Sequence, residues 1–246
     1  MRVLIVADIH YSLRQYDWVL KHGPAFDLVV VAGDLLDLAG HVDIETQIVV
    51  VSKYLSRLGA LVPVVVCSGN HDADNRNAAG EAIVEWLQDC REEGIAVDRD
   101  HVPVGPGLIT ICPWWDGPTS RRELEAFLAA SRRPERGKWI WIHHVPPNNT
   151  AVSWSGKKHN GDDFLNGLIE RFGPDLVISG HVHESPFRRG GSWIDRLGGA
   201  WVFNPGRQLG EIPTCIELDL AAGTATWLSL AGEEERALDE APTAAD

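Results

Sequence analysis

The sequence predicts an α/β fold, in which buried strands alternate with amphipathic helices. Short apolar segments rich in Val, Ile and Leu recur along the chain, as in strands that are buried on both faces. Segments with apolar residues at helical spacing separate them. Polar residues directly follow several of the apolar segments, which is typical of the sheet edge where α/β proteins bind ligands.

The predicted strands are recognised by their β-branched and aromatic residues and by the turn residues that flank them. They cover residues 2–7, 27–32, 63–67, 139–143, 175–179, 200–203, 214–220 and 224–230. The last two flank Ala221-Ala222-Gly223, which has the composition of a hairpin turn. The final third of the chain is therefore expected to be rich in strands.

The predicted helices follow from apolar spacing and from signals at their ends. They cover residues 44–58, 76–93, 120–130 and 162–172. Asp43 is the expected N-cap of the first helix, and Gly59 lies just past its end. Ser120 begins a capping box that opens the third helix, and Gly173 stops the fourth.

We expect one domain over residues 1–232. The chain has 246 residues, of which 44% are hydrophobic and 23% charged, an ordinary composition for a soluble globular protein. Residues 233–246 are acidic and have no apolar face, so that we expect a disordered tail there.

Charge and composition restrict the partners and the location. The net charge of -13 argues against broad electrostatic capture of nucleic acid, although bound metal ions change the local field and leave a nuclease open. No apolar run could span a bilayer, and the N-terminus lacks the features of a signal peptide. The cysteines form no C-x-x-C pair, which favours reduced, buried thiols. We expect a cytoplasmic protein; the sequence does not indicate its oligomeric state.

Short motifs that contain metal-binding side chains occur in a fixed order. They are Asp8-Ile9-His10, Gly33-Asp34, Gly69-Asn70-His71-Asp72, His143-His144 and Gly180-His181-Val182-His183. Carboxylate, imidazole and amide oxygen are ligands of divalent cations such as Mn²⁺, Fe²⁺ and Zn²⁺. Each motif follows a predicted strand, so that loops at one sheet edge would bring these side chains together.

The charge of such a site indicates its substrate. Two divalent ions bring +4, and only Asp8 and Asp34 are ionised ligands, so that about +2 remains, or about +1 with a bridging hydroxide. This excess charge attracts an anionic oxygen compound such as a phosphate ester. It also lowers the pKa of a metal-bound water toward about 7, which makes hydroxide available as a nucleophile.

The order D-x-H, G-D, G-N-H-D, H-H, G-H-x-H resembles the calcineurin-like metallophosphoesterase superfamily, and in particular its bacterial phosphodiesterase branch. The resemblance implies a four-layer α/β/β/α sandwich with two mixed β-sheets and a dinuclear site at the C-terminal ends of strands. By this resemblance one ion is held by Asp8, His10, Asp34 and His183. The other is held by Asp34, Asn70, a histidine of the fourth motif, and His181.

The resemblance gives His71 the role of contacting the phosphoryl group or protonating the leaving oxygen. In the fourth motif His144 is favoured over His143, because the family often places its ligand two residues before a proline, here Pro146. Asp72 is a candidate catalytic residue that orients His71. Asp37 is either a neighbour of the ligands or the start of a helix.

Substrate contacts are less specific in the sequence. Asn70, His71 and Arg207 are the candidate phosphate contacts, although a surface salt bridge explains Arg207 equally well. Residues 146–163 form the longest irregular stretch, between two motifs, and are expected to contribute to substrate choice. Trp114-Trp115 and Trp154 lie in predicted loops, where they either pack or stack on a nucleobase or an apolar alcohol.

Taken together, these features predict a dinuclear metal-dependent phosphoesterase with a small soluble substrate. Phosphodiesters are favoured and phosphomonoesters come close behind. The alternatives are a DNA-repair nuclease of the same superfamily and a catalytically inactive scaffold with the same fold. The absence of a basic stripe argues against the first, and the intact set of ligands argues against the second.

Overall fold

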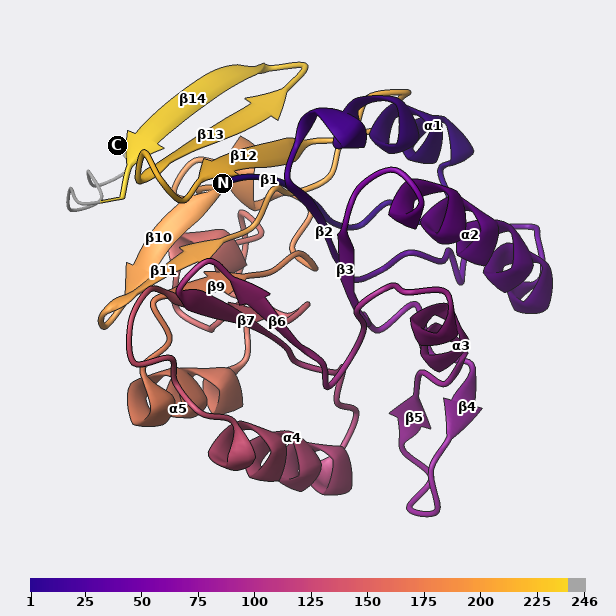
Figure 1. Cartoon of the computed structure of the whole chain (residues 1–246), viewed down its shortest axis with the longest axis horizontal. Coiled ribbons are helices and arrows are strands. Elements are labelled where there is room, and N and C mark those ends of the chain that lie inside the picture. The colour runs from indigo at the N-terminus through magenta and orange to yellow at the C-terminus, as the bar shows by residue number, and fades with distance from the viewer. Residues whose placement is uncertain (239–246) are drawn as a thin grey trace.

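The computed structural model describes residues 1–238, which form two large mixed β-sheets and a small hairpin (Figure 1). The first sheet has the order β14 (Gly232–Ala237), β13 (Thr224–Ser229), β12 (Cys215–Asp219), β1 (Arg2–Val6), β2 (Leu28–Ala32), β3 (Val64–Cys67). The second has the order β10 (Ile194–Leu197), β11 (Ala200–Phe203), β9 (Leu176–Ile178), β8 (Trp139–Ile142), β7 (Gly107–Ile111), β6 (His101–Val104).

Parallel pairing is confined to the part of each sheet that carries the motifs. In the first sheet β1, β2 and β3 are parallel, whereas β12, β13 and β14 add antiparallel strands. In the second sheet β7, β8, β9 and β11 are parallel, and β6 and β10 are antiparallel at the two edges. The carboxyl ends of the parallel strands therefore lie at one edge of each sheet.

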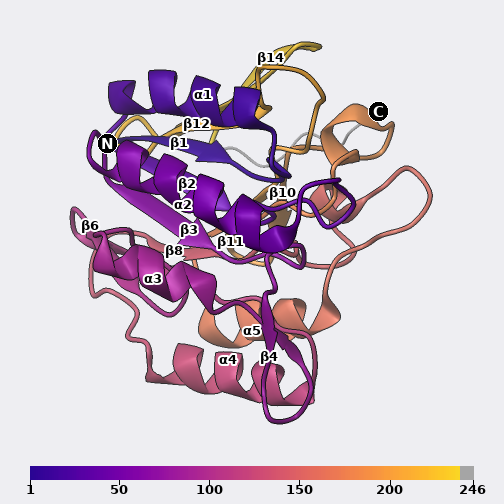
Figure 2. The ribbon, with the colours of Figure 1, turned by 90° about the vertical axis from the view of Figure 1, so that its right-hand side faces the viewer.

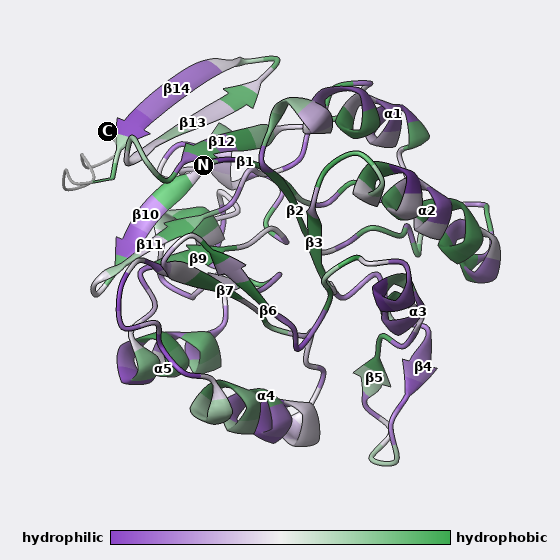
Figure 3. Ribbon diagram, viewed as in Figure 1, coloured by the Kyte–Doolittle hydropathy of each residue, from purple (hydrophilic) through white to green (hydrophobic). Residues whose placement is uncertain are grey.

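The two sheets share an apolar core between them. Alternate residues of a strand point to opposite faces, and in β1 Val3 and Ile5 lie in the same buried cluster as Ile140 and Ile142 of β8. Figure 3 shows how strongly hydrophobic β1, β2 and β3 are. Because one buried cluster contains residues of both sheets, the sheets pack face to face.

Helices cover the outer face of each sheet. The opposite residues of β1, Leu4 and Val6, pack with α1 (Leu13–His22), α2 (Ile44–Gly59) and α3 (Trp86–Glu92). Trp139 and Trp141 of β8 pack with α4 (Pro118–Ala130) and α5 (Asp163–Phe172). Figure 2 shows α1, α2 and α3 on the side that faces the viewer, with α4 and α5 below them. The predicted α/β fold with two mixed β-sheets is confirmed, and this packing of helices against the sheets agrees with the expected layers.

Several predicted helix ends are also confirmed. Asp43 caps α2, because its side chain accepts the Thr46 N–H at 2.8 Å. Gly173 ends α5 in the left-handed conformation, with φ of 64°, which glycine adopts without steric cost. Short 3₁₀ helices connect other elements: η1 (Gly23–Ala25), η2 (Ala151–Ser153) and η3 (Ser185–Phe187).

The helix predicted over residues 76–93 is wrong in its first half. This segment instead forms a hairpin, β4 (Asn75–Arg76) and β5 (Ala82–Ile83), and the helix begins only at Trp86. The Asn77 side chain accepts the N–H groups of Ala79 and Glu81, and Gly80 has φ of 80°. Side-chain capping of the backbone therefore competes successfully with the helix.

The start of α4 also differs from the prediction. The helix begins at Pro118 with Gly117 as its N-cap, so that Ser120 lies inside the first turn. The distant carboxylate of Glu81 accepts the N–H groups of Thr119 and Ser120, both at 2.7 Å. A side chain from the hairpin thus replaces the expected local cap.

The expected tail does not begin at residue 233. Residues 233–237 belong to β14, which pairs antiparallel with β13 along its whole length. Backbone pairing requires no apolar face, and charged side chains protect an edge strand from further pairing; Figure 3 shows β14 as hydrophilic. Residues 239–246 lie outside the described part of the chain. The elements α1, β6, β7 and β10 have no counterpart among the predicted elements.

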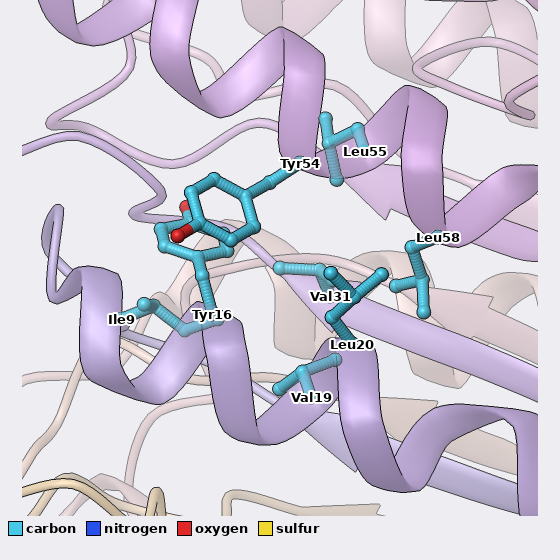
Figure 4. A pocket seen from close by; sticks show the side chains of 8 residues that line it. All are labelled: Ile9, Tyr16, Val19, Leu20, Val31, Tyr54, Leu55 and Leu58. Atoms are coloured by element: carbon cyan, nitrogen blue, oxygen red, sulfur yellow. The ribbon is translucent and has the colours of Figure 1, made fainter.

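The small apolar cavity between α1, α2 and β2 is a packing gap. Its volume is about 10 Å³, and it is lined by side chains such as Tyr16, Val31 and Leu58 (Figure 4). A volume of this size holds about one water molecule, and this lining offers few polar partners. Within residues 1–238, no helix has both the length and the apolar character needed to cross a membrane.

Candidate metal centre

The metal-binding side chains lie in loops at the carboxyl ends of parallel strands from both sheets. Asp8 and His10 follow β1, Asp34 follows β2, and Asn70 follows β3 in the first sheet. From the second sheet, His144 follows β8, and His181 and His183 follow β9. Each sheet therefore supplies one side of the centre.

The loops after β1 and β2 are tied together by their backbones. The Asp8 N–H donates to the Gly33 carbonyl at 3.1 Å, and the His10 N–H donates to the Asp34 carbonyl at 3.0 Å. Asp8, His10 and Asp34 have φ of 54°, 45° and 53°, values that cost energy in residues other than glycine. Strained backbone of this kind is typical of functional sites.

One group of donor atoms comes from Asp8, His10, Asp34 and His183, which all lie within 4.8 Å of one another. The Nε2 atoms of His10 and His183 are 3.0 Å apart, and His183 Nε2 is 3.3 Å from Asp8 Oδ1. Donor atoms at right angles around one ion, each at about 2.1 Å, are about 3 Å apart. This group fits a single divalent cation.

A second group consists of Asp34, His144 and His181. The Asn70 Oδ1 atom adds a neutral oxygen, 2.9 Å from His181 Nδ1. Asp34 belongs to both groups, and its carboxylate has two oxygens. The donor set therefore fits two cations that share one aspartate.

The two histidines of the fourth motif point to different surroundings. His144 donates from Nδ1 to the Ala32 carbonyl at 2.8 Å, which turns its Nε2 atom toward Asp34 Oδ2 at 3.2 Å. That Nε2 atom is buried and forms no hydrogen bond within the described residues. His143 bonds the Val145 carbonyl and lies in neither donor group. The geometry thus favours His144 as the ligand.

His71 lies beside the donor groups. The backbone N–H of His71 donates to Asp34 Oδ1 at 2.9 Å. The His71 ring stands edge to face with the ring of His10, at a centroid distance of 4.5 Å. A nitrogen of His71 and a carboxylate oxygen of Asp37 lie within 4.8 Å of each other and of His10. His71 and Asp37 are therefore neighbours at the rim of the centre.

Asp72 does not orient His71, contrary to the expectation. Its carboxylate is buried and accepts the backbone N–H groups of Leu35, Leu36 and Gly69 at 2.8–3.0 Å. Burial and the nearby Asp34 charge raise the pKa of Asp72 to about 8. Asp72 therefore joins the loops after β2 and β3.

The glycines of the motifs leave room for the ligands. A Cβ atom on Gly69 would lie 2.2 Å from Asp34 Oδ1, and one on Gly180 would lie 2.6 Å from Asp8 Oδ2. Gly33 has φ of 85°, and its Cβ would lie 2.4 Å from His144 Nδ1. These close approaches explain why a glycine precedes each ligand in G-D, G-N and G-H.

Arg207 lies near the centre and provides positive charge there. The backbone N–H of Arg207 donates to the His183 carbonyl at 3.0 Å. Burial is the main cause that lowers the pKa of His10 to about 4, and the charge of Arg207 acts in the same direction. Arg207 is thus close enough to attract an anion that reaches this edge of the centre.

Protonation of the centre is dominated by His144. Burial opposes its charged form, but the carboxylates of Asp34 and Asp8 outweigh burial and raise the pKa of His144 to about 10. Burial would raise the pKa of Asp34, yet the positive His144 lowers it overall. Burial lowers the pKa of His181 to about 4. The centre therefore holds anionic carboxylates beside neutral His10 and His181, and His144 would have to lose a proton to serve as a metal ligand.

Arg121 and Phe164 lie near the centre, although no sequence motif indicates a functional role for them. Both lie with Trp114 and Trp115 in a pocket that also includes His181. These residues belong to no motif, and only their convergence in the fold relates them to the centre. Trp154 lies elsewhere, with its Nε1–H bonded to the Arg189 carbonyl.

Comparisons with known proteins identify the family and the fold. The family model of calcineurin-like phosphoesterases matches residues 1–185. The structure of TT1561 from Thermus thermophilus is similar, with a TM-score of 0.59 and 17% identity over 96% of this chain and 98% of that chain. The purple acid phosphatase PPD1 from yellow lupin (Lupinus luteus) seeds has a TM-score of 0.55 and 15% identity over 98% of this chain and 52% of that chain.

At these identities the two structures show a common fold alone, and no curated protein sequence matches the chain. The family match, in contrast, covers residues 1–185, which include every ligand motif. The chain therefore belongs to the calcineurin-like phosphoesterase family, whose members hydrolyse phosphoric esters with the help of metal ions.

Proposed function

We propose that this protein hydrolyses small phosphodiesters at a dinuclear metal centre, with phosphomonoesters as the second substrate class. One observation carries the proposal: Asp34 belongs to both donor groups, so that one carboxylate can serve two cations. Water is the second substrate, and the products are an alcohol and a phosphomonoester.

The proposed ligands are Asp8, His10, Asp34, Asn70, His144, His181 and His183. Two divalent cations, when bound, would supply positive charge to the phosphoryl oxygens and would lower the pKa of a water molecule toward neutrality. Oxygen and nitrogen donors suit Mn²⁺, Fe²⁺ and Zn²⁺ alike. Arg207 adds a positive charge that acts on His10, and it would hold a further phosphoryl oxygen.

His71 is the proposed proton donor to the leaving oxygen. It is half-buried and lies next to the ligands. When the bond from phosphorus to the leaving oxygen breaks, a protonated His71 ring would give one proton to the alcohol and become neutral imidazole. Asp37, within 4.8 Å, takes the positioning role first expected of Asp72.

We also propose a cytoplasmic location. Cys67, Cys90, Cys112 and Cys215 are all buried free thiols, as in proteins of a reducing compartment.

The test is whether the purified protein hydrolyses bis(p-nitrophenyl) phosphate when Mn²⁺ is added. The assay is then repeated with p-nitrophenyl phosphate as the substrate, and with Fe²⁺ or Zn²⁺ in place of Mn²⁺. Metal content is measured in parallel by mass spectrometry, for the wild type and for Asp34→Asn. The wild type should bind two ions per chain and turn over the diester. Asp34→Asn should bind fewer ions and lose at least about 100-fold in kcat/KM.

The matched control is Asp17→Asn, a change of an exposed aspartate on α1. It should keep both the metal content and the activity of the wild type. Absence of turnover with all of these metals, or full activity of Asp34→Asn, would overturn the proposal.

A further inference from the structure

A pocket of about 490 Å³ lies directly beside the candidate metal centre. His181 forms part of its wall, and the ring of Trp114 stands edge to face with that of His144 at 6.4 Å. A phosphate ester held at the centre would therefore extend its organic group into this pocket. The volume is within the range of small-molecule sites.

Aromatic rings form one wall of the pocket. Trp114 and Trp115 are half-buried and nearly parallel, with an interplanar angle of 5° and centroids 6.1 Å apart. Phe164 stands edge to face with Trp115 at 6.1 Å. The Arg121 guanidinium lies 3.8 Å from the centre of the Trp115 ring. Flat surfaces of this kind attract flat rings by stacking.

The aromatic wall is held in place by the backbone around it. The Trp114 N–H donates to the Ser68 hydroxyl at 2.8 Å, and Asp116 accepts the Ala82 N–H at 2.8 Å. Elsewhere in the lining, the Asp162 backbone N–H donates to the Pro146 carbonyl at 2.9 Å. A wall that is ordered before a ligand arrives loses little conformational entropy when it binds.

The charges in the pocket disfavour a second anionic group. Arg121 is its one cation among the lining residues, whereas Asp162 and Asp163 are both acidic. The sum is therefore one positive charge against two carboxyl groups. Asn160 adds an amide that can donate and accept hydrogen bonds at the edge of a ring. A polyphosphate chain would meet repulsion here, and an alkyl chain would leave these polar groups without partners.

We propose that this pocket binds a flat, uncharged aromatic ring of the phosphate ester, and that Trp114 and Trp115 determine this specificity. The inference rests on the proposed phosphoester hydrolysis, because the ring is placed relative to a phosphoryl group at the metal centre. It goes further by defining the organic part of the substrate.

The test compares the binding of phenylphosphonate and methylphosphonate to manganese-loaded protein by isothermal titration calorimetry. The two ligands share the phosphonate group, contain no ester bond to hydrolyse, and differ mainly in the ring. The wild type should bind phenylphosphonate at least about 10-fold more tightly, which is within the range of stacking on an aromatic side chain. In Trp114→Ala and Trp115→Ala this preference should fall below about 3-fold, while methylphosphonate binds as before.

Trp18→Ala is the matched control, since Trp18 is a half-buried tryptophan of α1 that stacks on His22 and lies outside the pocket. It should keep the full preference. If an alanine variant also loses methylphosphonate, then Trp114→Leu and Trp115→Leu, which retain bulk but no aromatic face, should show the same loss of preference for the phenyl ring.

The outcomes separate this inference from the proposed function. If neither phosphonate binds and no ester is hydrolysed, the proposed function fails and the inference fails with it. If methylphosphonate binds and phenylphosphonate binds no more tightly, or if the preference survives in both tryptophan variants, the inference alone is overturned.

A second comparison distinguishes a nucleobase from a simple aryl group. AMP and ribose 5-phosphate are compared as competitive inhibitors of bis(p-nitrophenyl) phosphate hydrolysis. A ratio of inhibition constants above that of the phosphonate pair identifies a nucleobase as the ring. A smaller ratio identifies an aryl alcohol.

Discussion

His144 Nε2 lies 3.2 Å from Asp34 Oδ2, and this contact joins a residue of the second sheet to one of the first. Both side chains are buried. The other nitrogen of His144 is already bound to the Ala32 carbonyl, which fixes the orientation of the ring. The contact therefore depends on a single orientation of His144, and this makes the role of that residue testable.

Replacement of His144 should differ sharply from replacement of its neighbour His143. His144→Gln removes a nitrogen that faces Asp34, so that metal content should fall by about one ion per chain and kcat/KM by at least about 100-fold. His143→Gln changes a side chain outside both donor groups, and should keep the metal content. Mass spectrometry and kinetics of the purified variants check both; equal losses in the two variants would contradict the assignment.

Asp37 and Asp72 should affect different properties of the protein. Asp37→Asn should reduce kcat about 10- to 100-fold with little change in stability, because Asp37 is partly exposed and adjoins His71. Asp72→Asn should cost about 1–3 kcal/mol in unfolding free energy, because the carboxylate accepts three backbone N–H groups. Kinetics and urea unfolding on both variants distinguish the two roles. If Asp72→Asn lowers kcat and Asp37→Asn lowers only stability, then Asp72 is the residue that positions His71.

Gly69→Ala should abolish metal binding through Asp34. The added Cβ would lie 2.2 Å from Asp34 Oδ1 and 2.5 Å from its backbone nitrogen, so that the carboxylate must move. Gly167→Ala is the control, because this helical glycine of α5 has open space where its Cβ would lie. The control should gain about 0.5–1 kcal/mol in stability and keep full activity. Metal content and thermal unfolding measure the contrast.

Asp98 should make the protein less stable as the pH rises. Burial is the main cause that raises the pKa of Asp98 to about 6 in the folded state, above its ordinary value of 3.8. The folded protein therefore binds this proton more tightly than the unfolded chain does. Stability from this group is fully present below pH 3.8 and is lost as the pH rises toward about 6.

Asp98→Asn removes this titration and retains an oxygen for the Ser68 N–H. Between about pH 4 and about pH 7 the wild type should therefore lose up to about 3 kcal/mol of unfolding free energy relative to the variant. Urea unfolding at several pH values checks this. A difference that stays constant over this range would show that Asp98 does not titrate there.

The inner part of the fold could be predicted because its residues carry a local signal. Strands buried on both faces, such as β2 with its run of valines, require an apolar sequence, and Asp43 caps α2 through neighbours in the chain. The motifs were predictable for a related reason. Each ligand follows a strand directly, so that sheet topology alone brings Asp8 and Asp34 together.

The rest depends on contacts between segments that are distant in the sequence. Glu81 caps α4 from a hairpin 39 residues away from Ser120, and no local pattern predicts this. β14 is held by pairing with β13, although its own sequence is charged. Asp37 rather than Asp72 lies beside His71, because Asp72 turns into the backbone of a neighbouring loop. The cap of α4, the strand β14 and the neighbour of His71 are therefore set by tertiary contacts and not by the local sequence.

The division of the candidate ligands between two sheets gives a bound cation a mechanical effect. The inner faces of the sheets are joined by apolar packing, and the polar edge where Asp8 meets His183 is where they would most easily separate. A cation bound by ligands from both sheets would link the sheets at this edge. Because such a cation would bind the folded protein and not the unfolded chain, it would stabilise the sandwich against unfolding.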